Sequence, residues 1–331
     1  MTRPATSRIF TNQTRWILVC GLLLAGIVLK VTWDEQEKIW TDQLEQEVLE
    51  NVLILGGKLE IIEKELLGIL SLFNASERVT REEFSTYVQP ILRSNSYIHS
   101  LKWVPRITRR EREAYERAQK EAGLGYFRIW EPGPGGALVE AGDRDELFPV
   151  YYTEPFRGNE ALLGYDLASH PVLREFLEET RMSGRPLASR QIVFLPGIGD
   201  RRGIVVFAPF YRGLMTLGRT ILGPADLKGF VVGFYKIKDM IDQMVTPYLV
   251  PGINLVIYDG SDFNPENKLY GEPLNKARFE MQSVLNVSGR TWYLVWQGSD
   301  RFHNGPNRAY AFLAAGSTLG FAVFLAIIFR M

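Results

Sequence analysis

The side chains that could carry chemistry in this sequence are few and scattered. The three histidines, His99, His170 and His303, lack the spacing of metal ligands, and Cys20 is the single cysteine. The sequence contains no G-x-S-x-G, H-E-x-x-H or Walker motif. We therefore expect no catalytic residue, no metal site and no cofactor, and we predict that the chain itself is not an enzyme.

Two further segments have ordinary structural interpretations. The segment GIGDRRG at residues 197–203 misses the dinucleotide-binding spacing by one residue and lies between two expected strands, which favours a hairpin loop. The acidic segment at residues 143–146 reads DRDE and could bind a cation. Because an arginine interrupts the acids at the start of an expected strand, a solvated turn with a local ion pair is the better interpretation.

Asp166 is the most unusual acidic residue. It lies in the segment LGYDLA, among apolar and aromatic residues, just before a helix expected from Pro171. One interpretation is a helix cap or a member of an ion pair. The other is a carboxylate at the floor of a pocket, where it accepts hydrogen bonds from the N–H groups of a ligand. The residue pattern leaves both interpretations open.

The charge distribution limits the class of partner. The chain has 331 residues with 38 basic and 38 acidic side chains, and 46% of its residues are hydrophobic, which excludes disorder over most of its length. All 38 acids lie in residues 34–308, with 33 of the bases, so this part is mildly acidic. A nucleic-acid binder needs a concentrated basic footprint, so we expect no nucleic-acid partner.

Two apolar segments predict membrane spans. Residues 16–33 form the first, interrupted only by Lys30, and residues 309–329 form the second, which carries no charge. Each is long enough to cross a bilayer as a helix. A cleaved signal peptide is the alternative for the first segment, but no small-x-small cleavage site precedes Asp34. We therefore expect a multi-pass protein of the inner (plasma) membrane, in contact with lipid.

The orientation follows from the basic residues near the N-terminus. Arg3, Arg8 and Arg15 place residues 1–15 in the cytoplasm by the positive-inside rule, and two spans return the C-terminus to the same side. Residues 34–308 are then expected outside the cytoplasm. Because the chain ends two residues after the second span, we also expect that a cytoplasmic part is missing from it.

A stalk helix is predicted over residues 34–79. Its apolar residues recur at steps of three, four and seven, the period of a helix. They are Trp40, Leu44, Val48, Val52, Leu55, Leu59, Ile62, Leu66, Ile69 and Phe73. One face is expected to join the core of the neighbouring domain. Near the membrane, Trp40, Leu44, Val48 and Val52 are expected to pack on a second copy as a short coiled coil, which predicts a homodimer.

The remaining pattern predicts an α+β fold. A capping box at residues 80–83 opens a second helix. Strands are then expected at residues 100–107, 126–131, 147–153, 187–194, 203–211 and 229–236, with a helix at residues 171–182 among them. After a helix at residues 237–245, a smaller strand cluster is expected at residues 252–258, 279–287 and 290–297, which predicts a second compact domain near the membrane.

Several blocks of this sequence, in the right order, resemble the CHASE domain, the extracellular sensor of plant cytokinin receptor kinases and many bacterial receptors. The longest is GDRDELFPVYYTEPFRGNEALLGYDLASHPVLREFLEETRMSGRPLASRQIVFL at residues 142–195. SLKWVPRI precedes it, and GIVVFAPFY and GFVVGFYKI follow it. The resemblance covers residues 100–245, and separated blocks make it more specific than a single motif.

The resemblance implies an architecture and a function. The stalk helix would be followed by two PAS-like subdomains, a membrane-distal one at residues 80–236 and a membrane-proximal one at residues 237–308. The outer subdomain would bind a small molecule. The second span would lead to a cytoplasmic histidine kinase, nucleotide cyclase or diguanylate cyclase. The alternative is a membrane-anchored protein-interaction module without a small-molecule ligand.

The resemblance also implies ligand-binding residues. In the plant members an Asp in the block that matches GYDLA holds the adenine ring of cytokinin, and this position is Asp166 here. A Leu and a Thr after the following helix correspond to Leu187 and Ser189, where Ser keeps the hydroxyl and loses the methyl group. Gly229 and Gly233 match glycines that let the backbone line the pocket. An adenine-type or other small organic ligand is therefore expected.

Overall fold

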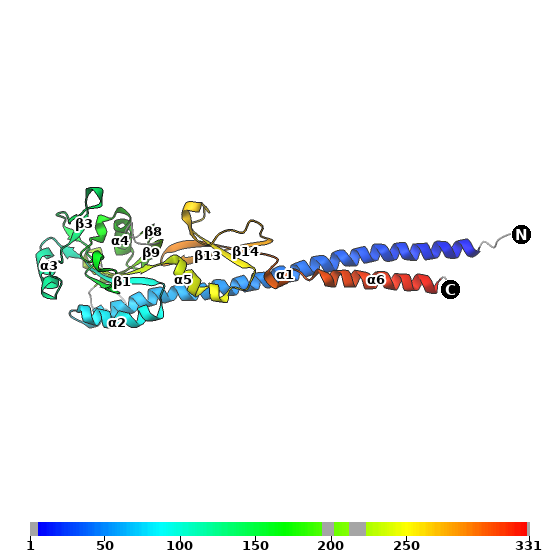
Figure 1. Ribbon diagram of the computed structural model, residues 1–331, viewed down its shortest axis with the longest axis horizontal. Helices are drawn as coiled ribbons and strands as arrows, with labels where there is room; N and C mark the ends of the chain where they lie inside the picture. The colour runs from blue at the N-terminus through cyan, green and yellow to red at the C-terminus, as the bar shows by residue number, and fades with distance from the viewer. Residues whose placement is uncertain (1–5, 194–201, 212–222, 330–331) are drawn as a thin grey trace.

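Two β-sheets lie one after the other along a single very long helix (Figure 1). The structure is a computed structural model that describes residues 6–193, 202–211 and 223–329. We call the six-stranded sheet far from the chain termini the distal sheet, and the four-stranded sheet nearer to them the proximal sheet. The predicted combination of helices and sheets with a long N-terminal helix is confirmed.

Helix α1 (Thr6–Ala75) runs without a break through both the first apolar segment and the expected stalk. With 70 residues it is about 105 Å long. No proline lies within it. It ends at Ala75, a few residues before the predicted end of the stalk.

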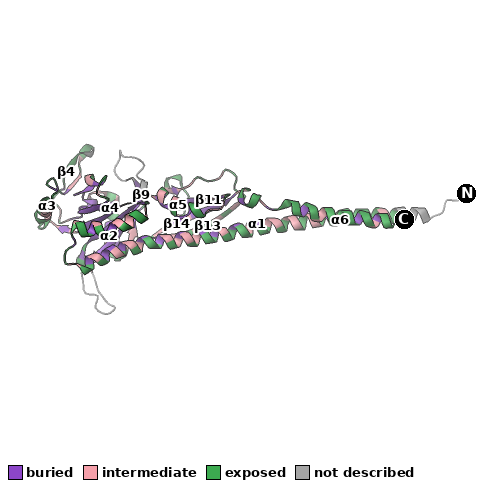
Figure 2. Cartoon of the chain, turned by 60° about the horizontal axis from the view of Figure 1, so that its bottom comes forward, coloured by how far each residue is buried: buried purple, intermediate pink, exposed green. Residues whose placement is uncertain are grey.

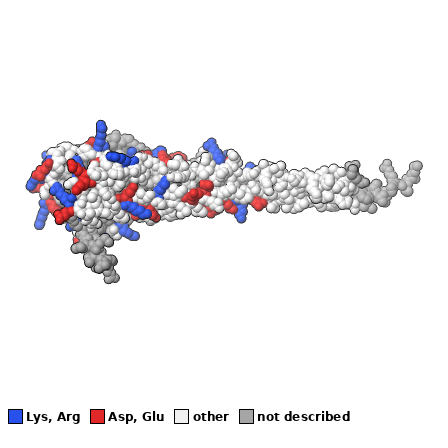
Figure 3. All heavy atoms as spheres, turned by 90° about the horizontal axis from the view of Figure 1, so that it is seen from below, with Lys and Arg blue, Asp and Glu red and all other residues white. Residues whose placement is uncertain are grey.

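Helix α6 (Arg308–Ile328) lies beside the N-terminal part of α1 (Figure 1). Small residues let the two helices approach closely, since a Cβ atom on Gly21 would lie only 2.2 Å from the Cβ of Ala322. Both helices are long and apolar enough to cross a membrane, by length and composition. Figure 3 shows the charged side chains on the sheet-bearing part of the visible face, while the described surface of the paired helices is almost free of them.

The inner face of the stalk is buried within the same chain (Figure 2). Trp40, Leu44 and Val48 are buried, and Val52 is half-buried. The indole N–H of Trp40 donates a hydrogen bond of 2.8 Å to the carbonyl oxygen of Phe302. The prediction that these four residues pack on a second copy is therefore wrong about their partner. The chain's own proximal sheet and the segment before α6 cover this face of the helix.

The distal sheet is antiparallel throughout. Its strand order is β6 (Tyr152–Glu154), β1 (Ile98–Pro105), β10 (Leu227–Tyr235), β9 (Arg202–Tyr211) and β7 (Leu187–Ala188), and β8 (Ile192–Val193) also pairs with β9. Two of the expected strands are interrupted. The expected strand at residues 187–194 contains the separate strands β7 and β8. The expected strand at residues 147–153 divides at Pro149, between β5 (Glu146–Leu147) and β6, because proline has no N–H for a ladder.

Alternation along β1 determines what each face of the distal sheet contacts. Trp103 faces α1 and stacks on Phe73, with ring centroids 4.0 Å apart. Its neighbour Lys102 points to the opposite face, where it meets Leu173 of α4 (Pro171–Ser183). The distal sheet is thus a layer between α1 and α4 (Figure 1).

Smaller elements complete the distal region. Helix α2 (Arg81–Ser94) begins with the predicted capping box, formed by Thr80 and Glu83. Helix α3 (Arg112–Glu121) lies at the distal tip. Two short ladders flank it, the first of β2 (Ile107–Thr108) with β5 and the second of β3 (Trp130–Pro132) with β4 (Leu138–Glu140).

The proximal sheet follows α5 (Ile237–Met244) and is also antiparallel. Its order is β12 (Lys268–Tyr270), β11 (Ile253–Asp259), β14 (Arg290–Gly298) and β13 (Phe279–Val287). The hairpin between β13 and β14 turns at Ser288 and Gly289, both with positive φ, as the turn chemistry predicts. A Cβ on Gly298 would lie 2.3 Å from Leu44, so this sheet packs directly on α1.

Candidate functional site

Asp166 is fully buried and caps a short 3-10 helix at Leu167–Ser169. Its Oδ1 accepts hydrogen bonds from the backbone N–H groups of Phe148, at 2.8 Å, and Ala168, at 3.2 Å. Its Oδ2 has no hydrogen-bond partner among the described residues and lies 3.4 Å from Nη1 of Arg144. Burial raises the pKa of Asp166, while the two backbone bonds and the Arg144 charge act to lower it. The carboxylate therefore has one oxygen that is hydrogen-bonded to the backbone and one that is ion-paired with Arg144 but accepts no hydrogen bond from the described residues.

Leu187 and Ser189 lie at the edge of the distal sheet. The backbone N–H of Ser189 donates to the carbonyl oxygen of Val205, and its hydroxyl accepts from the N–H of Val205 at 3.0 Å. Leu187 reaches the turn of the proximal sheet, where a Cβ on Gly289 would lie 2.4 Å from it. These two residues thus fasten β7 to its neighbours, and Leu187 joins the two sheets.

Gly229 and Gly233 lie on the face of β10 that is turned toward α1. Gly229 pairs with Pro105 and Gly233 with Leu101. A Cβ on Gly233 would lie 2.4 Å from the hydroxyl of Tyr235, so this glycine makes room for a tyrosine of its own strand. The structure therefore does not bring the five predicted residues together around one open cavity. Asp166 lies on the α4 side of the sheet, and the glycines lie on the α1 side.

The interior between the distal sheet and α4 is closed. Lys102, Leu173, Val205 and Val232 surround a gap that is too small for a water molecule. Lys102 is buried here, and its ammonium group donates a hydrogen bond to the hydroxyl of Ser100. A ligand on this side would have to separate α4 from the sheet.

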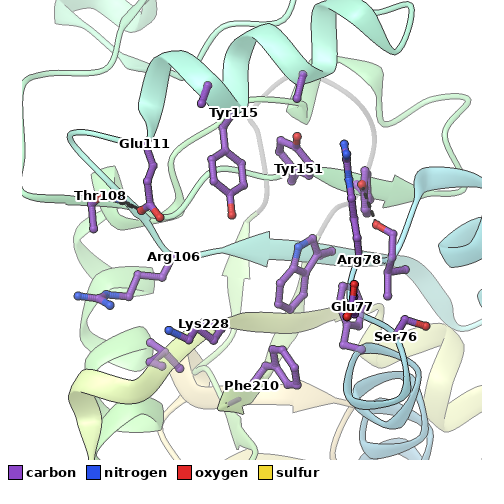
Figure 4. Close-up of a pocket in the computed structure, with 17 residues that line it drawn as sticks. Ser76, Glu77, Arg78, Arg106, Thr108, Glu111, Tyr115, Tyr151, Phe210 and Lys228 are labelled. Atoms are coloured by element: carbon purple, nitrogen blue, oxygen red, sulfur yellow. Dashed lines mark hydrogen bonds between the residues drawn. The ribbon is translucent and has the colours of Figure 1, made fainter. Parts of the chain in front are cut away.

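An open cavity of about 680 Å³ lies instead at the distal tip, on the α1 side of the sheet (Figure 4). It lies between the end of α1, strand β1 and helix α3. Its floor is aromatic, and charged groups stand around its rim. The aromatic residues are Phe73, Trp103, Tyr115, Tyr151, Tyr152 and Phe210, and the charged ones are Glu77, Arg78, Arg106, Glu111 and Lys228.

Some of the charged groups at this cavity already have partners. Nε of Arg106 donates to Glu146 at 2.8 Å. The carboxylate of Glu111 accepts from the backbone N–H of Thr108, at 2.9 Å, and from its hydroxyl, at 2.6 Å. These bonds fix the side of the cavity formed by β2 and α3. Arg78 has no ion-pair partner among the residues that the structure describes.

The tyrosine hydroxyls of the cavity remain protonated at neutral pH. Burial raises the pKa of Tyr115, of Tyr151 and of Tyr152, the last to about 12. The positive charge of Arg78, which lines the same cavity, acts in the opposite direction on all three. In Figure 4 the hydroxyl of Tyr115 points into the cavity, and Arg78 extends toward Tyr151.

A second polar cluster is partly buried where the stalk meets the start of β1. Oε1 of Glu65 accepts a hydrogen bond of 2.8 Å from Nδ2 of Asn95, whose Oδ1 accepts one from the hydroxyl of Tyr97. The fully buried Tyr235 lies near the same carboxylate. Burial raises the pKa of Glu65 to about 7, although the Asn95 bond acts to lower it. Glu65 therefore titrates near neutral pH.

Sequence reasoning did not find the tip cavity or the Glu65 cluster. Arg78, Tyr115 and Lys228 are far apart in the sequence and share no motif. Glu65 stands next to the buried stripe of α1, beside Leu66, and only the approach of Asn95 and Tyr235 shows that it is enclosed. Within the described residues, no three His, Cys, Asp or Glu side chains come together as ligands for a metal ion.

The fold is a long helix that carries two antiparallel sheets, and comparison with known proteins gives the family. The model of the CHASE domain family matches residues 77–270. The chain therefore belongs to the CHASE domain family and is a sensor module of the kind found in signalling receptors. The match begins just after α1 and includes the whole distal sheet and strands β11 and β12 of the proximal sheet, so it is wider than the segment whose sequence resembles the family.

Individual relatives are distant. Hybrid signal transduction histidine kinase A of Dictyostelium discoideum is 20% identical over 342 aligned positions, which cover 92% of this chain and 16% of that protein. The chain thus spans less than a fifth of that relative. Among solved structures, methyl-accepting chemotaxis protein X aligns with a TM-score of 0.44 and 8% identity, over 79% of this chain and 98% of the other.

The ligand-binding domain of the Pseudomonas aeruginosa PAO1 amino acid chemoreceptor PctB, solved with L-Arg, aligns with a TM-score of 0.43 and 10% identity. The alignment covers 78% of this chain and 95% of the other. Both TM-scores lie below 0.5, and neither structure bears on the ligand of this chain.

Replacing Asp166 tests its structural role. Asp166→Ala leaves two buried backbone N–H groups without an acceptor, so we expect the unliganded chain to lose about 1 to 3 kcal/mol of stability. Asp166→Asn retains Oδ1 and should lose less. Asp145→Ala is the matched control, because that carboxylate is exposed. Denaturant unfolding measures all three. An unchanged midpoint for Asp166→Ala would refute the structural role and favour a purely ligand-facing carboxylate.

The raised pKa of Glu65 predicts that the stability of the folded chain depends on pH. Between its ordinary value of 4.5 and its folded pKa of about 7, only the folded chain holds the proton, so rising pH favours unfolding. We expect the stabilising contribution of this group to be complete below about pH 4.5 and to be lost as pH rises through 7. Glu65→Gln should flatten this part of the profile, whereas Glu60→Gln, an exposed change on the same helix, should not. Thermal unfolding from pH 5 to 8 compares them, and identical profiles for wild type and Glu65→Gln would contradict the prediction.

Proposed function

We propose that this chain is the extracytoplasmic ligand-binding sensor of a transmembrane signalling receptor. Residues 34–308 bind a small molecule outside the cytoplasm, and α1 and α6 are the two membrane spans. A kinase or cyclase follows α6 on the cytoplasmic side of the complete receptor. The observation that supports this most directly is the continuity of α1, which reaches from the first apolar segment to Phe73 at the distal sheet without a break.

The proposal includes two PAS-like subdomains. Residues 80–236 form the membrane-distal one, around the distal sheet, and residues 237–308 form the membrane-proximal one, around the proximal sheet. Each sheet packs one face on α1, and α5 connects them. Leu187 at the turn of the β13–β14 hairpin gives a direct contact through which the two subdomains move together.

Transmission follows from this packing. A ligand that binds one arrangement of the distal subdomain more tightly than another shifts the populations of the two, by no more than its differential affinity. Any shift of β1 reaches α1 through the stacked rings of Trp103 and Phe73. Because α1 is one rigid helix and α6 packs on it through Gly21 and Ala322, the displacement continues into both spans.

The ligand proposed from the family resemblance is an adenine-type or other small organic molecule with N–H donors. Oδ2 of Asp166 has no hydrogen bond to the described residues, and it is the atom that would accept a hydrogen bond from an N–H group of this ligand. Leu187, Ser189, Gly229 and Gly233 remain the other predicted contacts. Binding on this side requires the closed gap between the distal sheet and α4 to widen.

We also propose a parallel homodimer, formed by the outer face of the stalk. Leu49, Leu53, Ile61 and Leu67 are exposed on α1, on the side opposite to the buried stripe, and a Cβ on Gly57 would contact no other atom. The occupant is a second copy, because two chains anchored in one membrane with the same orientation present parallel stalks to each other. This face replaces the one predicted from the sequence.

Topology is the first test of this function. Reporter fusions after residue 15 and after residue 331 should both signal the cytoplasm, because basic residues flank the first span on that side. A cysteine at Leu138, which is 68% exposed at the tip of the β3–β4 ladder, should react with a membrane-impermeant maleimide from outside, in a chain whose Cys20 is replaced by Ser. Fusions that both report an external location would exclude the proposed orientation.

Crosslinking tests the dimer. In the same Cys20→Ser background, single cysteines at Leu49 and Leu53 should form disulfide-linked dimers in membranes, because these positions lie on the exposed face. Val48→Cys and Leu55→Cys are the controls, since both side chains are buried against the chain's own sheets. Equal crosslinking at all four positions, or none at Leu49 and Leu53, would rule out this interface.

A further inference from the structure

The tip cavity is separate from the ligand position that the family resemblance implies. Its floor is formed by Trp103 and Phe210, on the face of the distal sheet that packs on Phe73 of α1. Asp166 lies on the α4 side, where its neighbour Leu167 borders the closed gap. The cavity is already open at about 680 Å³, which is within the size range of small-molecule sites.

The floor of the cavity suits a planar apolar group. Trp103 and Phe73 stack at 4.0 Å, and the ring of Phe210 meets both, edge-on to Trp103 at 5.8 Å and tilted to Phe73 at 5.9 Å. Aromatic rings gain from such offset and edge contacts beyond the area they bury. A further aromatic ring entering from the open side would extend this cluster.

The charged groups at the rim distinguish between anionic and cationic ligands. Arg106 shares the carboxylate of Glu146 with Arg181, and the carboxylate of Glu111 accepts two hydrogen bonds from Thr108 and lies in the field of Lys228. Arg78 is left as a cation without an ion-pair partner among the described residues. It lines the same cavity as Tyr115 and Tyr151 and extends toward Tyr151 (Figure 4). A guanidinium with neighbouring O–H donors is suited to a carboxylate.

We propose that the tip cavity binds an aromatic carboxylate, with its ring on Trp103 and Phe210 and its carboxylate at Arg78 and the hydroxyl of Tyr115. This proposal rests on the proposed receptor function, because it treats the bound carboxylate as the signal. Phe73 and Arg78 belong to the end of the stalk and the turn that follows it, and Tyr115 belongs to α3. A ligand that bridges them joins the tip of α1 to α3 and reaches the stalk without passing through the sheet.

The test uses the full chain in lipid nanodiscs and three compounds that share one ring. These are 3-phenylpropionate, 3-phenylpropanamide and 3-phenylpropylamine, which are negative, neutral and positive. Isothermal titration should show the carboxylate binding at least about tenfold more tightly than the amide, as expected for a charge-assisted bond, and the amine more weakly than either. If the carboxylate binds no better than the amide, or if none of the three binds, the proposal fails.

Variants locate the site. Arg78→Gln should remove the preference for the carboxylate over the amide while leaving amide binding intact, and Tyr115→Phe should reduce the preference severalfold. Arg117→Gln, an exposed change on the outer side of α3, is the matched control and should bind like wild type. Arg78 is exposed, so its variant is expected to fold, and circular dichroism checks this. Unchanged discrimination in Arg78→Gln would overturn the assignment.

The two proposals fail in different ways. If the phenyl compounds do not bind but an adenine derivative raises the melting temperature of wild type and not of Asp166→Asn, the sensor function stands and the tip site is refuted. If 3-phenylpropionate binds with Arg78-dependent selectivity while both reporter fusions signal an external location, the tip site stands and the proposed receptor topology is refuted.

Discussion

Burial of one face of α1 is the constraint on which the rest of this structure depends. Along the stalk the helix has apolar residues at every turn, and they meet the proximal sheet at Leu44 and the distal sheet at Phe73. Helix α2 also contributes to the distal core, where Phe84 packs on Phe73 and Tyr152, but both sheets pack on the same helix α1. Two sheets that share one rigid helix cannot rotate about it independently without exposing this face, which makes the helix the natural carrier of any change in either sheet.

The same constraint explains what the sequence could predict and what it could not. The helix period, the capping box at Thr80 and Glu83, and the turn at Ser288 and Gly289 are local signals, and the structure agrees with each. The prediction that Trp40 packs on a second copy was wrong, because the helix period identifies which face is buried but not which segment covers it. Only the return of Phe302 from the far end of the chain, 262 residues away, supplies that partner.

The candidate sites were less predictable than the fold. Asp166 stood out because a carboxylate among apolar residues is costly to bury, and it is indeed fully buried. The sequence pattern could not show that the two carboxylate oxygens have different partners. One accepts hydrogen bonds from the backbone of Phe148 and Ala168, and the other lies near Arg144. The tip cavity was invisible, since Arg78, Tyr115 and Phe210 meet only when the end of α1, helix α3 and β9 converge.

Strand β1 links both candidate positions to the stalk. Successive residues of a strand point to opposite faces, so Lys102 borders the closed gap beside α4 while Trp103 forms the floor of the tip cavity and stacks on Phe73. A ligand on either face must therefore act on the same eight-residue strand. Expansion of the gap would press β1 toward α1, whereas a ring in the tip cavity would press on Phe73 and Trp103 from the open side. Ligands at the two proposed positions would thus be coupled through strand β1, and both would act on the stalk through it.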